Sequence, residues 1–108
     1  MAISSDLIRG HTDMIILANL MKEDSYGYRI NREIQEKTNN MFELKEATLY
    51  SAFRRMEKEG VIRSYWGVED LGARRRYYTI TPEGRAAFAQ YCKEWDQVKT
   101  TIDQLITL

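Results

Sequence analysis

The stretch EATLYSAFRRMEKEGVI, residues 46–62, has the pattern of one amphipathic helix that ends at Gly60 and is followed by an apolar pair. One side of its helical wheel is apolar and is predicted to face a core: Leu49, Ala52, Phe53 and Met56. The opposite side is small, polar or cationic: Ala47, Ser51, Arg54 and Lys58, flanked by Thr48, Tyr50 and Arg55. The small residues come first and the cations follow one turn later.

A helix whose first turn enters the major groove of DNA needs small side chains there for close approach, and cations further along for the phosphates. The outer face of this helix has this order, and Arg54 is also long enough to reach a guanine edge. A solvated surface helix shows the same composition, so this helix alone leaves both interpretations open. The segments on either side decide between them.

The segment that follows, VIRSYWGVEDLGARRRYYTI at residues 61–80, predicts a β-hairpin. Two runs of β-branched and aromatic residues flank a longer loop that contains Gly67 and Gly72. The aromatic residues favour cross-strand packing over base stacking: Tyr65, Trp66, Tyr77 and Tyr78. Arg74 and Arg75 lie near the tip and are candidates for phosphate or minor-groove contacts.

Two helices are predicted before the opening stretch. The first spans residues 4–22 and is apolar on much of its circumference, with Gly10 either weakening it or marking a close packing point. The second lies in EDSYGYRINREIQEKTNN, residues 23–40, with Asp24 or Ser25 as its cap. Tyr26 and Tyr28 precede or begin this helix: one is expected in the core and the other at a phosphate, and Tyr26 is the candidate for DNA contact. A short strand, MFEL at residues 41–44, is predicted next.

The last helix has the clearest start in the chain, with Thr81 as its cap, Pro82 at the first helical position and Glu83 next. Its apolar residues follow steps of 3, 4, 3, 4 and 3: Phe88, Tyr91, Trp95, Val98, Ile102 and Leu105. This heptad spacing is typical of a helix that packs lengthwise on another helix. We therefore expect these residues to form a homodimer interface.

Trp95 lies in the middle of this seam and, under two-fold symmetry, is expected to face its own copy. Two interpretations stay open. Trp95 is either a dimer-core residue or one wall of a pore between the subunits, where it stacks on a flat aromatic or cationic ligand. In the second case Val98 adjoins the wall, and the candidate partners of a cationic ligand are acidic: Asp96, Asp13 and Asp6.

The order helix, helix, short strand, helix, hairpin, helix predicts an α+β, mostly α fold: a winged helix-turn-helix with a C-terminal dimerisation helix. We expect residues 1–80 to form a winged-helix DNA-binding domain, with the helix in residues 1–23 also packing at the dimer interface. Residues 81–108 are expected to form the dimerisation helix of the same compact domain. The helix that begins at residue 46 and stops at Gly60 is then the one that enters the major groove.

Composition sets the remaining bounds. At 108 residues the chain is one domain, and its 16 basic and 16 acidic residues cancel. The charges are nevertheless segregated, since residues 48–85 carry eight basic and five acidic side chains. Cys92, the single cysteine, excludes an intramolecular disulfide and favours a reducing compartment. With no signal peptide and no apolar run of bilayer length, we expect a cytoplasmic protein that does not engage a membrane.

Catalytic and metal-binding residues are scarce. His11 is the only histidine and Cys92 the only cysteine, and neither has an evident orienting group. No glycine-rich phosphate loop is present, and one histidine with one cysteine makes a poor zinc site. We expect no enzyme activity, no cofactor and no metal.

Several motifs, in this order and at these spacings, resemble one family: LIRGHTDMIILANL (7–20), YGYRINREI (26–34), ATLYSAFRRMEKEGVI (47–62), Trp66 and RRRYYTITPEG (74–84). The chain resembles the PadR-family transcriptional regulators, and most of all their short, LmrR-like branch. The resemblance implies a dimeric winged-helix repressor whose C-terminal helix carries the dimer interface, with a tryptophan at the position of Trp95 in a ligand pore. GAR at residues 72–74 departs from the family pattern, and Ala73 is expected to stiffen the wing tip.

Two classes of function follow. The first is a ligand-responsive repressor that binds an inverted-repeat operator in double-stranded DNA as a homodimer. The second is a winged-helix module that uses the same surfaces to bind protein, without specific DNA binding. The basic residues beside the groove-compatible helix favour DNA: Arg54, Lys58, Arg74 and Arg75.

Overall fold

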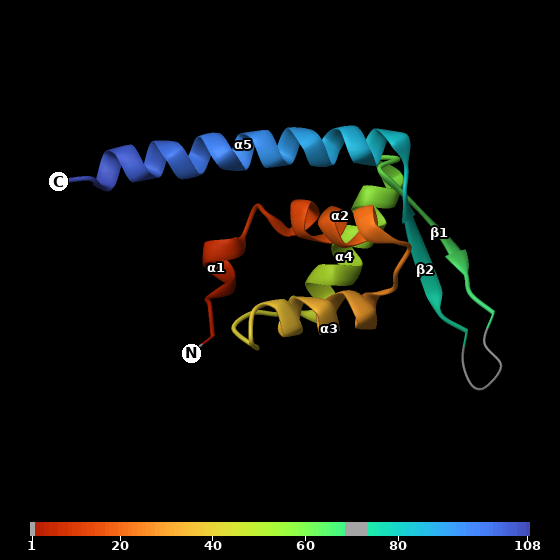
Figure 1. Ribbon diagram of the computed structural model, residues 1–108. Helices are drawn as coiled ribbons and strands as arrows, with labels where there is room; N and C mark the ends of the chain where they lie inside the picture. Colours follow the sequence, from red (N-terminus) through yellow and green to blue (C-terminus); the bar gives the residue numbers. More distant parts are fainter. Residues whose placement is uncertain (1, 69–73) are drawn as a thin grey trace.

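The computed structural model describes residues 2–68 and 74–108, and in this part of the chain there are five helices and a two-stranded antiparallel sheet that lies at one side of them (Figure 1). The elements are α1 (Ser5–Ile8), α2 (Thr12–Lys22), α3 (Gly27–Lys37), α4 (Glu46–Lys58), β1 (Ile62–Trp66), β2 (Arg76–Ile80) and α5 (Pro82–Ile106). The predicted fold class is confirmed: mostly helical, with a two-stranded wing and a long C-terminal helix. The described helices include none that is long and apolar enough to cross a membrane.

The core lies where α2, α3, α4 and the wing meet. α2 contributes Ile16, Leu17 and Leu20, and α4 contributes its predicted inner face: Leu49, Ala52, Phe53 and Met56. The Phe53 ring stacks on Tyr78 of β2 with centroids 3.9 Å apart, which joins α4 to the wing. Each large apolar side chain buried in this way contributes roughly 1.5–3 kcal/mol, so this cluster fixes the orientation of α4.

α4 ends as predicted. Gly60 follows its last turn with φ +80°, a conformation that costs an L side chain energy and glycine almost none. A Cβ on Gly60 would meet nothing within 4 Å, so the backbone angle rather than crowding favours glycine there. The amide of Val61 donates to the Met56 carbonyl at 3.1 Å, and the chain then turns directly into β1.

The first predicted helix is broken, contrary to the expectation of one helix over residues 4–22. α1 ends at Ile8 and α2 begins at Thr12, because Gly10 has φ +91° and cannot continue a right-handed helix. Of the two interpretations of Gly10, the weakened helix is confirmed, and the close packing point is wrong, because nothing lies within 4 Å of a Cβ at that position.

The cap predicted for α3 is wrong as well. Tyr26 is the N-cap and makes no side-chain cap hydrogen bond. Ser25 instead pairs with Tyr78 through its backbone, in an isolated antiparallel bridge with N···O distances of 3.2 and 2.8 Å. This bridge holds the start of α3 against the wing.

Residues 41–44 form no strand, although Phe42 and Leu44 are buried and alternate with exposed Met41 and Glu43. Their backbone is held by side chains of α3 and its end, not by a neighbouring strand. The Thr38 hydroxyl accepts from the Phe42 amide at 3.2 Å, and Asn31 binds the backbone of Leu44. The segment is therefore a fixed turn that connects α3 to α4.

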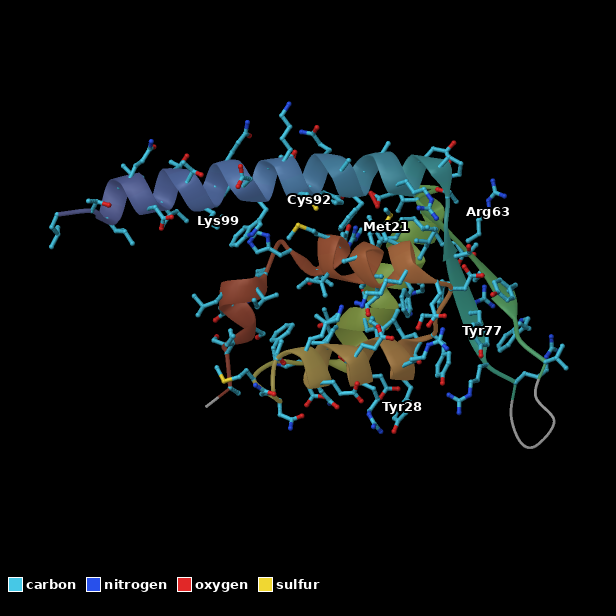
Figure 2. All side chains as sticks on the ribbon, in the orientation of Figure 1. Met21, Tyr28, Arg63, Tyr77, Cys92 and Lys99 are labelled. Atoms are coloured by element: carbon cyan, nitrogen blue, oxygen red, sulfur yellow. The ribbon has the colours of Figure 1, made fainter. Side chains whose placement is uncertain are left out.

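The hairpin and the start of α5 follow the prediction. Ile62 lies opposite Ile80, and Trp66 lies opposite Arg76. The Thr81 hydroxyl accepts from the Gly84 amide at 3.0 Å, and Pro82 occupies the first turn. α5 then runs along α2, with Met21 in the layer between them, and its C-terminal half extends beyond the rest of the chain (Figures 1 and 2). The predicted stiffening of the wing tip by Ala73 lies outside the described residues.

Candidate nucleic-acid interface

The outer face of α4 is open to solvent along its whole length. Ala47, Thr48 and Ser51 are exposed in the first half, and Arg54 and Lys58 are exposed in the second. In residues 2–68 and 74–108, neither Arg54 nor Lys58 takes part in an ion pair. The helix thus presents small polar groups followed by two cations that are available to an anion.

Tyr50 lies on the flank of α4 that faces α3. Its ring packs edge-on against Phe53, with the centroids 5.7 Å apart. A Cβ on Gly27 would lie 2.9 Å from the Tyr50 hydroxyl oxygen, so a larger residue at the start of α3 would require the Tyr50 side chain to shift. Tyr28, by contrast, is 63% exposed on the side of α3 that faces away from α2 (Figure 2).

The three consecutive arginines of the wing each lie over an aromatic ring. The guanidinium carbons of Arg74 and Arg76 are both 5.3 Å from the ring centroid of Trp66. Arg75 points to the other side of the strand, with its guanidinium carbon 4.4 Å from the Tyr26 centroid. Such cation–π contacts hold long cationic side chains near a preferred direction.

The tyrosines beneath these arginines pack on one another. Tyr65 stacks on Tyr77 across the hairpin at 5.6 Å and 14°, which agrees with the prediction of cross-strand packing. Tyr26 meets the edge of Tyr77 at 5.2 Å and is half-buried. The Tyr65 hydroxyl donates to Asp24 at 2.6 Å, and this hydrogen bond raises the pKa of Tyr65 above its ordinary value.

Two residues that the sequence did not single out tie the wing to α4. Ser64 donates to Glu57 at 2.6 Å, and Arg76 donates to Ser64 at 2.7 Å. Arg76 also lies 3.8 Å from the Glu57 carboxylate. The signal that could have found them is the hairpin register, since Ser64 and Arg76 share one face of the paired strands.

Arg55 differs from the other cations of α4, because it already binds a carboxylate. Its two terminal nitrogens each lie 2.7 Å from an oxygen of Asp13, in the first turn of α2. These hydrogen bonds hold the pKa of the Arg55 guanidinium above its usual range. Glu59 is a second, weaker neighbour at 3.4 Å.

The apolar seam of α5 divides into two parts. Phe88 and Tyr91 are half-buried and pack against the core of their own chain. Burial raises the pKa of the Tyr91 phenol. The remaining members are exposed on the free half of the helix: Trp95, Val98, Ile102 and Leu105.

The candidate ligand residues are not gathered within one chain. Trp95 is 40% exposed, and its ring meets the edge of His11 at 5.0 Å. Asp96 lies 3.9 Å from Lys99 on the solvent side of α5, while Asp13 binds Arg55. Asp6 pairs with Arg9 at 2.5 Å. In the described part of the chain, His, Cys, Asp and Glu form no cluster of three or more that could hold a metal ion.

These features define a class: a winged helix-turn-helix protein with a solvent-exposed helix beside an arginine-bearing wing, and a long C-terminal helix. Residues 16–90 match the transcriptional regulator PadR-like family, and the chain belongs to this family. The family consists of transcription regulators, which confirms that the chain is not an enzyme.

Similar proteins agree in sequence and in structure. A transcriptional regulator from Clostridium thermocellum is 50% identical, with a TM-score of 0.89 over 98% of this chain and 100% of that one. A PadR family transcription regulator from Clostridium difficile is 37% identical, with a TM-score of 0.76 over 91% of this chain and 100% of that one. "Uncharacterized protein X" from Lysinibacillus sphaericus is 50% identical over 101 residues, which cover 94% of this chain and 93% of its own.

Proposed function

We propose that the chain is a ligand-responsive repressor of the LmrR-like branch, which binds an inverted-repeat operator as a homodimer. The observation that carries the DNA-binding part is the exposed face of α4, where Arg54 and Lys58 have no ion-pair partner in the described residues. A helix held rigidly by its buried side, with unpaired cations on the other, suits a groove lined by phosphates. Such a regulator is proposed to act in the cytoplasm.

Contacts to DNA divide by position. Ser51 and Arg54, at the middle of the exposed face, are proposed to reach base edges, with Thr48 and Tyr50 beside them. The cations of the last turn of α4 and of the wing are proposed to bind phosphates: Lys58, Arg74 and Arg75. Arg55, on the flank of α4, is proposed to bind a phosphate only when its pair with Asp13 opens. Tyr26 lies under Arg75 and is proposed to contribute to the same phosphate contact. In a dimer, two such surfaces would meet half-sites about 34 Å apart, one helical turn, or a multiple of it.

The dimer is supported by the free half of α5. The apolar residues there follow heptad spacing: Val98, Ile102 and Leu105. In the single chain, Ile102 is 49% exposed and Leu105 is 77% exposed. An apolar stripe on an otherwise charged helix favours a partner helix, and a second copy offers the same stripe. Residues 81–108 would then serve both the core of the chain and its assembly.

A ligand site is supported by Trp95 and His11. Their rings meet at 70°, and the exposed part of Trp95 leaves surface on which a flat aromatic or cationic compound can stack. Val98 lies one turn further along α5, and Asp96 supplies a nearby negative charge. In a dimer two copies of Trp95 would approach each other, which would complete the site.

The direct test is a retardation assay with the DNA upstream of the chain's own gene, beside unrelated DNA of equal length. A specific, salt-sensitive complex with the upstream DNA supports the proposal. Equal, weak binding to both fragments, together with capture of a defined protein partner through α4, would favour the alternative function of a protein-interaction module.

A further inference from the structure

Arg55, on the exposed flank of α4, binds a carboxylate of another helix through both of its terminal nitrogens. Among the residues that the structure describes, no other cation of α4 does so. Nη1 and Nη2 each lie 2.7 Å from an Asp13 oxygen, and the two residues are 42 positions apart in sequence. The Asp13 side chain is 17% exposed and the Arg55 side chain is 51% exposed. The carboxylate is therefore mostly buried, whereas the guanidinium is accessible to solvent. This two-point geometry is the strongest kind of arginine ion pair.

The pair lies at the edge of the surface proposed to meet DNA. Arg55, Thr48 and Ser51 line one open, shallow hollow on the outside of α4, and Thr12 of α2 also lines it. The Asp13 carboxylate binds Arg55 at 2.7 Å, so it lies next to a residue that lines this hollow. A phosphate that approached this flank of α4 would reach Arg55 from its exposed side.

A phosphate and a carboxylate present the same feature to arginine: two oxygens at the spacing of the guanidinium fork. We propose that Asp13 acts as an internal substitute for a DNA phosphate, which occupies Arg55 and so lowers the affinity of the protein for DNA of any sequence. This inference rests on the proposed DNA-binding function. It makes Asp13 a residue that sets DNA affinity without touching DNA, by withholding one cation.

Glu59 does not replace Asp13 in this role. It lies 3.4 Å from Arg55 on the same helix, and both side chains are about half exposed. Exposed pairs of this kind contribute little and are readily exchanged for another anion. Removal of the Asp13 charge therefore leaves Arg55 available.

The test uses Asp13→Asn, which keeps the shape of the side chain and removes its charge. DNA affinity is measured as a function of salt, for upstream and unrelated DNA, in three backgrounds: wild type, Arg54→Ala and Arg55→Ala. We expect Asp13→Asn to tighten binding to both DNAs by about fivefold at about 0.15 M salt and to steepen the salt slope by about 0.9, the effect of one added phosphate contact. The gain should persist with Arg54→Ala and vanish with Arg55→Ala.

Each other outcome is decisive. A gain that survives Arg55→Ala would be a general effect of the lost negative charge, and the inference would be wrong. Weaker binding or an unchanged salt slope, with an unchanged thermal midpoint, would show that Asp13 orients α4 or has no role in DNA binding. If wild type retards DNA while Asp13→Asn behaves identically, only this inference fails; if neither protein retards DNA, the proposed function fails with it.

Discussion

The side-chain amide of Asn31 grips the backbone of Leu44 from both directions. Its Nδ2 donates to the Leu44 carbonyl oxygen at 2.7 Å, and its Oδ1 accepts from the Leu44 amide at 2.8 Å. Asn31 belongs to α3, and Leu44 lies two residues before α4. This pair of hydrogen bonds therefore sets where the exposed helix begins relative to the helix before it.

Replacement of Asn31 by alanine should destabilise the fold by roughly 1–3 kcal/mol, because both Leu44 groups lose their partner in a part-buried site. Urea denaturation followed by circular dichroism measures this change. Gln35→Ala is the matched control on the same helix, since Gln35 donates only to the exposed Glu43 carboxylate. The control should change stability by less than about 0.5 kcal/mol. Equal effects of the two substitutions would contradict a specific role for Asn31.

Lys58→Ala and Arg74→Ala should each weaken binding to all DNA sequences alike. Each should also lower the slope of log affinity against log salt by about one, because each phosphate contact releases about one counterion. Fluorescence anisotropy over a salt series measures both quantities. Lys99→Ala, on the extended part of α5 (Figure 2), is the control of equal charge and should change neither. If Lys58 and Arg74 behave like Lys99 in folded protein, their surface is only solvated.

Ser51→Ala and Arg54→Ala should act on sequence discrimination. Both residues lie at the middle of the exposed face of α4, where base edges rather than phosphates are expected. Loss of a bidentate base contact by Arg54 should cost about 1–3 kcal/mol at the matching base pair and little elsewhere. Competition binding with operator variants that each carry one base change shows at which base pair the discrimination is lost. A uniform loss over all variants would assign Arg54 to the phosphates instead.

Ile102→Glu should convert the protein to a folded monomer. A charge placed on the exposed apolar stripe opposes helix pairing, whereas the core of the chain ends at Phe88 and Tyr91 and is untouched. Light scattering gives the mass, and circular dichroism confirms the fold. Thr100→Glu is the control, because residue 100 lies on the opposite side of α5. A wild-type monomer at micromolar concentration would refute the dimer outright.

The elements predicted best from the sequence are those with both a strong period and a marked end. α4 combines an apolar stripe with Gly60, and α5 combines a heptad with Thr81 and Pro82. The break at Gly10 was missed because an apolar pattern continues across a single left-handed residue without interruption. A helical wheel shows which side of a helix is exposed. It cannot show that one helix ends before Gly10 and that a second helix, α2, begins after it.

The predicted strand at residues 41–44 shows how a correct period can give a wrong structure. Phe42 and Leu44 are buried alternately, as in a strand. Their amides bind Thr38 and Asn31, so side chains take the place of a neighbouring strand. Because a local pattern reports burial and not hydrogen-bond partners, these contacts could not be read from it.

The candidate site was predictable as a face and not as a set of contacts. Arg54 and Lys58 lie exposed where the wheel placed them. The helical wheel also placed Arg55 on the flank of the exposed face of α4. It could not identify Asp13, 42 residues away, as the partner of Arg55. Such a pair depends on the packing of α2 against α4, which no local pattern contains.

The chain has two tryptophans, one in the wing and one in α5, and each lies in a different proposed site. Trp66 lies between two arginines of the wing, and Trp95 lies against His11 on α5. Because indole emission responds to nearby charge, each tryptophan is an optical reporter of a different event. A protein that keeps only Trp66 would report what reaches the wing, and one that keeps only Trp95 would report what reaches α5. The fold thus carries two separable fluorescence channels, without any added label.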